Sequence, residues 1–310
     1  MNDINDVSPL LKTILFADDT SLSSVISLFP SGPRRTSLAI NNELEKITDW
    51  LRANKLSLNV KKTKYMVFRF SQTQENSLPK LNLKMNGVNI AKVTTFKFLG
   101  ITISETLSWK PHLDIIAKKI SKVTGVMNRI KYQVNSSILQ TIYNSLILSH
   151  LHYGILCWGF YGNRLFKLQK KAVRVVDKQK YNAHTDPIFK RLKLLKIEDI
   201  FKVQCLKFYF KLKNKSLPSY FVSNFILTRS GDLHEYHLRS NNYRSEAVRR
   251  HSTNKRIRLF LPTLLNGTPN ELLGKVSTHS LDSFKRRSKN LYLDSYSDGC
   301  TKDRCYICSR

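Results

Sequence analysis

The spacing of the apolar residues changes near residue 107, and this change limits the folds open to the chain more than any other feature. Before it, short alternating apolar runs, which favour strands, surround one stretch with the three- and four-residue spacing of an amphipathic helix. Beyond it, helical spacing continues to about residue 227. We therefore predict an α+β region over residues 1–106, an all-α region over 107–227 and a loosely ordered basic region over 228–310.

Strand and turn signals occur throughout the first region. Thr13–Phe16 and Thr20–Ser27 are β-prone runs on either side of a short acidic turn, a pattern that predicts a hairpin. Leu81–Met85 and Thr94–Ile103 are strand candidates on either side of Asn86-Gly87, a dipeptide that favours a tight hairpin turn.

Between these segments the sequence predicts one helix and two more strands. The helix is defined by a single apolar stripe, Ile40, Leu44, Ile47 and Leu51. Strict alternation then predicts a strand through Leu56, Leu58 and Val60. Tyr65–Phe70 is strand-like as well.

The second region begins with the clearest helical pattern in the chain. Its apolar stripe consists of Leu113, Ile116, Ile120, Val123, Met127 and Ile130. Pro111 suits the first turn of such a helix, and cations occupy its other faces. Further helices are predicted over Ser137–His152, Arg164–Val176, Ile197–Lys211 and, in the third region, near Leu281–Tyr292.

The charge of the chain is strongly positive and unevenly placed. There are 52 Lys and Arg against 22 Asp and Glu, which gives a formal net charge of +30. Residues 1–106 contribute +5 and residues 107–310 contribute +25. Such a surplus repels itself in a compact state unless a polyanion neutralises it, which indicates nucleic acid as the first partner and an anionic membrane as the second.

One long stretch without charge raises the question of a membrane span. Residues 132–163 contain no Asp, Glu, Lys or Arg. A spanning helix needs about 20 predominantly apolar residues, and here polar residues and glycines interrupt the run. We expect a buried helix and no membrane association.

The cysteines indicate a reducing compartment. Five of them at irregular spacings do not form a disulfide framework, and the chain does not start with a signal peptide, so we expect an intracellular protein, nuclear or cytoplasmic. Cys300, Cys305 and Cys308 offer three soft ligands near the C-terminus. A closed zinc site needs a fourth, for which His279 is one candidate, and the alternative that we favour is an unliganded tail.

The sharpest local signal is Phe16-Ala17-Asp18-Asp19 in the first predicted hairpin. Two adjacent carboxylates raise each other's pKa unless a cation neutralises them, and hard cations such as Mg²⁺ prefer carboxylate oxygens. Two metals about 3.5–4 Å apart can activate a 3′ hydroxyl and stabilise a leaving pyrophosphate. Taken alone, the pair is better explained by ordinary turn chemistry, because Asp favours turns.

The order of these segments resembles the reverse transcriptases of non-LTR retrotransposons, the jockey-like group in particular. The matching segments are the strand–FADD–strand unit, an amphipathic helix, LSLNVKKTKYMVF, FKFLGITIS and a basic helix, followed by Ser145-Leu146, Tyr153-Gly154, LQKKAVR and Leu217-Pro218. The resemblance covers most of the chain. It implies a truncated polymerase palm of antiparallel strands with a packed helix, then a thumb-like helical domain.

The resemblance also implies an activity, RNA-directed DNA polymerisation by two-metal nucleotidyl transfer, with an RNA template and a DNA primer or target as partners. Asp18 and Asp19 would be catalytic, metal-binding carboxylates for Mg²⁺ or Mn²⁺, with Asp18 the more important. Phe16 and Ala17 would shape the turn beside the primer end.

Two further segments receive roles from the resemblance. Lys62 would lie near the incoming triphosphate and protonate the departing pyrophosphate; Lys61 and Lys64 are adjacent alternatives, and a solvated basic face is another. Phe98-Leu99-Gly100 would form a hairpin that holds the primer strand, although the first two residues are also suited to a core.

The segment before Asp18 departs from the family pattern. A further catalytic Asp and a template-contacting segment do not fit there, and Met1-Asn2-Asp3-Ile4 resembles the stretch that follows them. We therefore expect the chain to begin within the palm, to lack the fingers, and not to polymerise by itself.

Nucleic-acid binding depends less on the missing part. Lys118, Lys119, Lys122 and Arg129 on the first helix of the second region are candidate phosphate contacts, with affinity that falls steeply with salt. Five aromatic residues are candidate stacking groups: Trp109, Tyr132, Tyr143, Trp158 and Tyr161. For the last three, helical spacing in charge-free surroundings favours core packing instead.

Three hypotheses follow from the sequence. The chain is part of a reverse transcriptase, or a non-catalytic module that binds RNA or DNA without sequence preference, or a relic of a transposable element without a present role.

Overall fold

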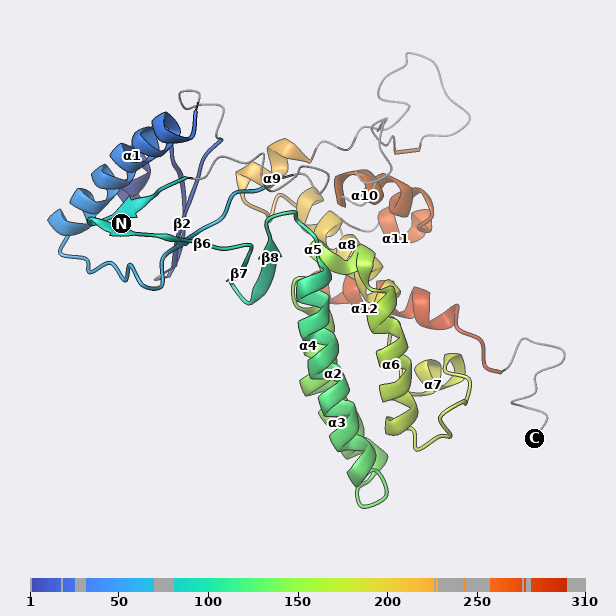
Figure 1. Ribbon diagram of the computed structural model, residues 1–310. Coiled ribbons are helices and arrows are strands. Elements are labelled where there is room, and N and C mark those ends of the chain that lie inside the picture. The colour runs from blue at the N-terminus through green and yellow to red at the C-terminus, as the bar shows by residue number, and fades with distance from the viewer. Residues whose placement is uncertain are drawn as a thin grey trace, which may run out of the picture. The chain divides into compact units, whose positions relative to one another are not determined.

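The protein is a mixed α+β chain that is mostly helical, and its contacts divide it into two compact units, Met1–Pro111 and His112–Arg310 (Figure 1). The computed structural model describes residues 2–17, 19–25, 32–69, 81–225, 227, 242–243, 257–274, 276 and 280–299. Each unit is described by itself below.

The first unit places one long helix against short strands. Helix α1 (Pro33–Ala53) begins with Pro33 in its first turn, where a missing N–H costs nothing. The predicted apolar stripe faces the core: Leu44 and Ile47 are buried, and Ile40 and Leu51 are half-buried. The core of the unit comprises Ile4, Leu11, Leu44, Ile47, Leu83, Met85 and Ile90.

The strands of this unit pair in twos. β1 (Lys12–Phe16) and β2 (Asp19–Ser23) form the predicted first hairpin. β4 (Lys84–Met85) pairs antiparallel with β5 (Val88–Asn89) across Asn86-Gly87, whose φ values of 52° and 76° suit the tight turn that this dipeptide favours. β3 (Lys64–Tyr65) lies parallel to β6 (Ala91–Lys92).

Three strand predictions in this unit are wrong. Of the described part of Tyr65–Phe70, only Tyr65 lies in a strand, β3. The segment through Leu56, Leu58 and Val60 forms no strand, because Asn59 accepts hydrogen bonds from the chain that follows it and closes a turn. Thr94–Ile103 is not one strand but a hairpin of β7 (Thr95–Phe98) and β8 (Ile101–Ser104).

In the second unit, a long helix carries the predicted apolar stripe. α2 (Lys110–Ile130) buries Leu113, Ile116, Ile120 and Met127, with Val123 and Ile130 half-buried. The charge-free stretch that follows is helical, as predicted: α3 (Ser136–Tyr143), a π-helical turn η4 (Asn144–Leu148) and α4 (Ser149–His152) run on continuously. No helix in the described ranges combines the length and apolarity that a bilayer crossing requires.

Most of the remaining helices of this unit pack around α8 (Ile197–Lys213), whereas α7 packs on α6 and α12, and α11 packs on α12 (Figure 1). They are α5 (Ile155–Trp158), η5 (Gly159–Tyr161), α6 (Asn163–Val176), α7 (Asp186–Arg191), α9 (Ser219–Asn224), α10 (Ile257–Asn266), α11 (Asn270–Gly274) and α12 (Leu281–Asp294). The helix predicted near Leu281–Tyr292 is therefore present. Helices α5, α7, α9, α10 and α11 were not predicted.

Four helices end in the same way. After α1, α6, α7 and α8 a lysine adopts a left-handed conformation, and the backbone there closes the paired hydrogen bonds of a Schellman motif. The lysines are Lys55, Lys178, Lys193 and Lys215, with φ between 51° and 57°. Glycine usually occupies this position, so each lysine accepts backbone strain while its charge interacts favourably with the helix dipole.

Candidate active-site turn and nucleic-acid interface

The β1–β2 hairpin brings part of the predicted metal-binding motif to one tip. Phe16 and Asp19 are the last paired residues of the two strands, so the loop between them consists of Ala17 and Asp18. Ala17 has φ 52°, the left-handed conformation that tight two-residue hairpin loops require. Asp18 lies outside the described residues.

One face of this hairpin exposes two apolar side chains among polar ones. Directly paired residues share a face, so Phe16 lies beside Asp19, while Ile14 lies on the same face two residues along β1. Ile14 and Phe16 are 57% and 59% exposed, whereas Leu15, on the opposite face, packs against the core. The tip therefore combines a carboxylate with uncovered apolar surface.

Among the described residues of this tip, Asp19 supplies the one carboxylate, a group that hard cations prefer. Asp19 is exposed and forms no ion pair with any Lys or Arg among the described residues. The described part of the chain holds no group of three or more His, Cys, Asp or Glu arranged for a metal ion. With Asp18 outside these residues, Mg²⁺ or Mn²⁺ stays a prediction.

Lys62 lies in a different element, the turn after α1. Its backbone N–H donates to Asn59 Oδ1 at 3.1 Å, and Thr63 Oγ1 donates to the Asn59 carbonyl at 3.0 Å. The side chains of Lys61, Lys62 and Lys64 are all exposed. Exposure therefore does not distinguish which of the three would contact a triphosphate. No ion pair joins Lys62 to Asp19 where the chain is described.

The residues assigned to the primer lie at the turn of β7–β8. Leu99 and Gly100 form the loop, with φ values of 45° and 82°, and Phe98 pairs with Ile101. The hairpin that the resemblance implies is thus present. Phe98 and Leu99 are half-buried and Gly100 is exposed, which agrees with partial core packing as well as with a surface role.

The cations predicted on α2 are exposed together. Lys118, Lys119, Lys122 and Arg129 all lie on the solvent side of the helix, opposite the buried stripe. Burial and the charge of Lys119 lower the pKa of His150, so the two side chains lie within electrostatic reach. This face offers phosphate contacts at helical spacing.

The five candidate stacking residues are buried or exposed as the sequence predicts, with one exception. Tyr143 and Trp158 are fully buried, as predicted for core packing, and Trp158 Nε1 donates to the Tyr153 carbonyl at 3.0 Å. Tyr161 is 38% exposed, so its predicted burial is wrong. Trp109 is half-buried, and Tyr132 is exposed beneath Lys131 Nζ, 4.8 Å from its ring centroid.

The candidate zinc ligands Cys300, Cys305 and Cys308, together with His279, lie outside the described residues. Of the other cysteines, Cys205 is buried, which raises its pKa to about 12, and Cys157 also has a pKa raised by burial. Neither is a thiolate at neutral pH.

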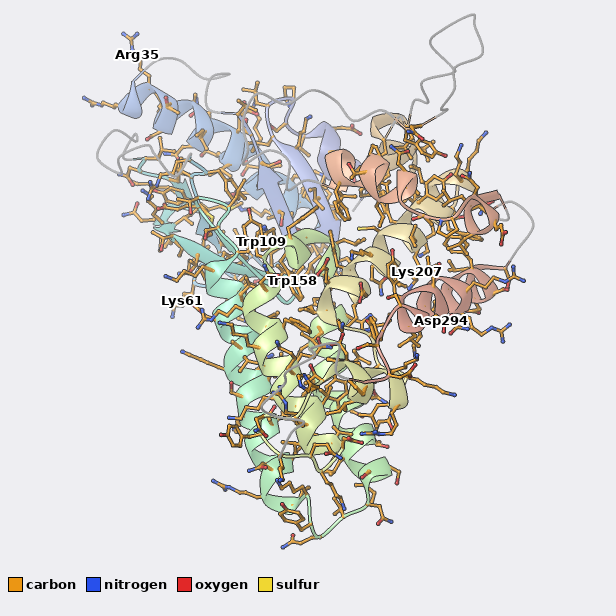
Figure 2. All side chains as sticks on the ribbon, turned by 90° about the vertical axis from the view of Figure 1, so that its right-hand side faces the viewer. Arg35, Lys61, Trp109, Trp158, Lys207 and Asp294 are labelled. Atoms are coloured by element: carbon orange, nitrogen blue, oxygen red, sulfur yellow. The ribbon has the colours of Figure 1, made fainter. Side chains whose placement is uncertain are left out.

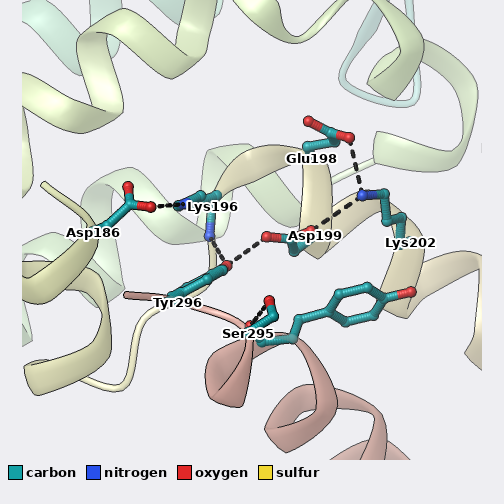
Figure 3. Close-up of polar contacts among 8 residues, drawn as sticks. Asp186, Lys196, Glu198, Asp199, Lys202, Ser295 and Tyr296 are labelled. Atoms are coloured by element: carbon teal, nitrogen blue, oxygen red, sulfur yellow. Dashed lines mark hydrogen bonds and ion pairs between the residues drawn. The ribbon is translucent and has the colours of Figure 1, made fainter. Parts of the chain in front are cut away.

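A buried polar network near α8 was not predicted from the sequence (Figure 3). Tyr296 Oη donates to Asp199 Oδ2 at 2.5 Å and accepts from the Lys196 N–H at 2.9 Å. Lys196 Nζ pairs with Asp186, while Lys202 Nζ pairs with both Glu198 and Asp199. The network fastens the segment after α12 to the start of α8.

A second buried polar residue holds α6 to the chain before α8. Gln169 Nε2 donates to Tyr143 Oη and to the Leu195 carbonyl, and its Oε1 accepts from the Ile197 N–H at 2.9 Å. Gln169 sits among apolar positions of an amphipathic helix, so its partners could not be identified from spacing. Two lysine pairs at i,i+4 spacing were also not predicted as functional residues, although their spacing is visible in the sequence. They are Lys207/Lys211 on α8 and Lys285/Lys289 on α12.

Comparison of the chain with models of protein families, with curated protein sequences and with solved structures found no match.

Proposed function

We propose that the chain is part of an RNA-directed DNA polymerase of the non-LTR retrotransposon type, and that it binds an RNA template and a DNA primer. The observation that carries the proposal is the β1–β2 tip. There, Phe16 and Asp19 pair at the end of a tight hairpin, with exposed Asp19 beside exposed apolar side chains.

Each residue at the tip has a distinct part in the proposal. Asp18 and Asp19 would hold Mg²⁺ or Mn²⁺, which when bound activates a 3′ hydroxyl and stabilises the leaving pyrophosphate. Phe16 offers an exposed ring against which the sugar and base of a primer end can pack. Ala17 keeps the tip narrow because its side chain is small.

Two other segments would contact the primer and the nucleotide. The exposed loop glycine Gly100 allows a nucleic-acid backbone to approach closely, with Phe98 and Leu99 fixing the hairpin behind it. Lys62 would neutralise triphosphate charge from its exposed turn.

A second candidate function needs no metal. The helical unit alone exposes Lys118, Lys119, Lys122 and Arg129 on a helix, α2, whose opposite face is buried. With these cations the chain can bind RNA or DNA without sequence preference even if it catalyses nothing. This function is favoured by the placement of most of the positive charge in residues 107–310.

A fluorescence anisotropy titration separates the two functions. The polymerase proposal expects a recessed DNA primer on an RNA template to bind more tightly than a blunt DNA duplex of equal length, with Mg²⁺ increasing the difference. Asp19→Asn removes the Mg²⁺ effect and spares the rest of the affinity. Equal affinity for both ligands, unaffected by Mg²⁺ or by Asp19→Asn, would leave the non-catalytic function.

Primer extension on poly(A)/oligo(dT) addresses catalysis directly. We expect no incorporation by this 310-residue polypeptide alone with Mg²⁺ or Mn²⁺, because the family that it resembles uses a further catalytic Asp and a fingers region that no segment of these residues matches. Incorporation that Asp18→Ala abolishes would refute this expectation.

A further inference from the structure

Helices α8 and α12 lie side by side and run antiparallel. The end of α8 meets the start of α12, where the rings of Phe210 and Phe284 are 5.0 Å apart. The start of α8 meets the end of α12, where Lys202 Nζ lies 5.6 Å from the ring centroid of Tyr292. Because these contacts recur in step along both helices, residues between them are neighbours across the pair.

Four lysines occupy the middle of this helix pair. Lys207 and Lys211 lie four residues apart on α8, and Lys285 and Lys289 lie four residues apart on α12, so each pair shares one face of its helix. Figure 2 shows Lys207 on α8 where α12 passes it. We refer to these four side chains as the α8–α12 lysine cluster.

The lysines of the cluster repel one another. Burial and the nearby charges of Lys285 and Lys211 lower the pKa of Lys207, while Asp282 acts weakly in the opposite direction. Burial and Lys285 lower the pKa of Lys289 in the same way, with a further contribution from Lys193. In the described ranges no carboxylate forms an ion pair with any member of the cluster.

A histidine from a third helix borders the cluster. His152 of α4 shares a hydrogen bond with Gln204 Nε2, 2.9 Å from its Nδ1. Burial and the charges of Lys207, Lys285 and Lys289 lower its pKa, so it is neutral at pH 7 and adds no charge of its own. The positive surface is thus formed by the lysines of α8 and α12, and the neutral ring of His152 borders it.

We propose that the α8–α12 lysine cluster binds the phosphodiester backbone of a nucleic acid, as a contact separate from the α2 face. Residues four apart on a helix are about 6 Å apart along its axis, which lets the two pairs contact successive or alternate phosphates, spaced by about 3.4 Å of axis per strand. This inference rests on the proposed binding of nucleic acid, and it assigns a second place where the backbone is held.

A lipid surface fits the cluster less well. Helices that lie on anionic membranes insert large apolar side chains beside their cations. Among the described residues of α8 and α12 no large apolar side chain is exposed. Recognition here is therefore electrostatic and independent of base sequence.

Three double variants of the full chain test the inference, each removing an i,i+4 lysine pair from one helix. Lys285→Gln/Lys289→Gln alters the cluster, Lys118→Gln/Lys122→Gln alters the α2 face, and Lys167→Gln/Lys171→Gln on α6 is the matched control, with both lysines exposed. Binding to a primer–template is measured by anisotropy over a range of salt concentrations from about 50 to about 300 mM.

We expect the α12 variant to raise the Kd at least about tenfold at about 0.1 M salt and to reduce the salt slope by about 2, because each substituted lysine leaves one phosphate without its cation. The α6 control should change the Kd less than about twofold. Vesicles of anionic lipid should bind wild type and variant equally weakly.

The other outcomes overturn the inference in distinguishable ways. Equal losses of affinity in the α12 and α6 variants would show diffuse attraction, and weaker binding by the α2 variant alone would leave the cluster without a role; the proposed function survives both. If wild type binds no nucleic acid at low salt, the proposed function fails and the inference fails with it.

A thermal melt without nucleic acid distinguishes loss of a binding contact from loss of folding in the α12 variant. Removing repelling charges should raise the Tm of the α12 variant by about 1–2 °C at low salt, since like-charge pairs destabilise a helix slightly. A lower Tm would attribute weakened binding to unfolding and would overturn the proposal.

Discussion

The two units of this chain differ in how they hold their candidate functional residues. In His112–Arg310, cations project from long helices such as α2, and the neighbouring short helices bury Trp158, Tyr143 and Phe189 completely. In Met1–Pro111, the carboxylate tip stands on a two-stranded hairpin whose outer face is largely exposed. We thus assign the binding of a polyanion to the better-packed unit, and the candidate metal chemistry to the unit whose hairpin has less packing behind it.

This difference suggests a division of labour. Phosphate contacts tolerate small movements, because charge attraction falls off gradually with distance. Metal-assisted transfer requires fixed geometry. We therefore expect binding to persist when the hairpin is altered, and we expect the hairpin to need a nucleic-acid partner to reach a fixed arrangement. The substitutions that follow test the comparison, in order of decreasing effect.

Trp158→Ala should have the largest effect, because it opens a cavity in the helical unit and leaves the Tyr153 carbonyl without its indole donor. We expect the free energy of unfolding to fall by about 3–5 kcal/mol. Chemical denaturation with hydrogen exchange by mass spectrometry should show the effect in peptides from residues 112–225. Tyr181→Ala, at a position 90% exposed, is the control; a decrease below about 1 kcal/mol for Trp158→Ala would contradict the packing described.

Arg69→Ala is the corresponding test in the first unit. Arg69 donates through Nε and Nη2 to Glu105 Oε1 at 3.0 and 2.8 Å, and both side chains are largely buried. Removing the cation leaves Glu105 charged and buried, which costs about 3 kcal/mol. Reduced protection from exchange should be confined to residues 33–111. If helices of the second unit become equally unprotected, the two units are not independent.

Tyr296→Phe should cost about 1–3 kcal/mol, because Asp199 and the Lys196 N–H are each deprived of a buried partner. Release of the segment after α12 is the expected structural result, measured as faster exchange in residues 280–299. Tyr181→Phe serves as the exposed control. Unchanged stability would show that the network in Figure 3 contributes nothing net.

The same tyrosine predicts a dependence on alkaline pH. Burial, with the neighbouring Asp199 carboxylate, raises the pKa of Tyr296, and burial raises that of Tyr292 to about 12. A group with a raised folded pKa stabilises the native state below its unfolded pKa, which for tyrosine is about 10. That contribution disappears as the pH rises toward the folded value, by up to about 1.4 kcal/mol per pH unit for each group. Tyr296→Phe should flatten this decline in stability between about pH 10 and about pH 11.

Lysine-to-glycine changes at helix ends should have the smallest effect, and a stabilising one. Lys55→Gly in the first unit and Lys193→Gly in the second each relieve a left-handed lysine. We expect the free energy of unfolding to rise by about 0.5–1 kcal/mol, because the relief exceeds the entropy that glycine adds to the unfolded chain. A decrease at both sites in chemical denaturation would mean that the lysine charge at the helix end outweighs the strain.

Periodicity predicted the long elements and failed on the short ones. α1 and α2 are recognisable because their buried residues recur over several turns, and Asn86-Gly87 specifies its own turn. The break at Leu99 was not visible in the strand pattern, because a leucine rarely adopts positive φ and gives no turn signal. α7 has only six residues, too few for a stripe.

The candidate site was predicted in part for similar reasons. Exposed cations on α2 follow directly from the stripe that opposes them, and the hairpin under Asp19 follows from its flanking β-prone runs. The Tyr296–Asp199 contact joins residues 97 positions apart, so no local pattern reveals it. The same holds for the α8–α12 lysine cluster, which exists only because two distant helices pack together.

Iron-mediated affinity cleavage tests the central claim most directly. With primer–template bound and with ascorbate and hydrogen peroxide supplied, Fe²⁺ in place of Mg²⁺ at the hairpin should form radicals that cut the polypeptide next to residues 16–19. Excess Mg²⁺ should suppress the cut, as should Asp18→Asn or Asp19→Asn, while Asp6→Asn should leave it unchanged. Cleavage elsewhere, or cleavage at the hairpin that survives both Asp18→Asn and Asp19→Asn, would contradict the assignment of this turn to metal-dependent nucleotidyl transfer.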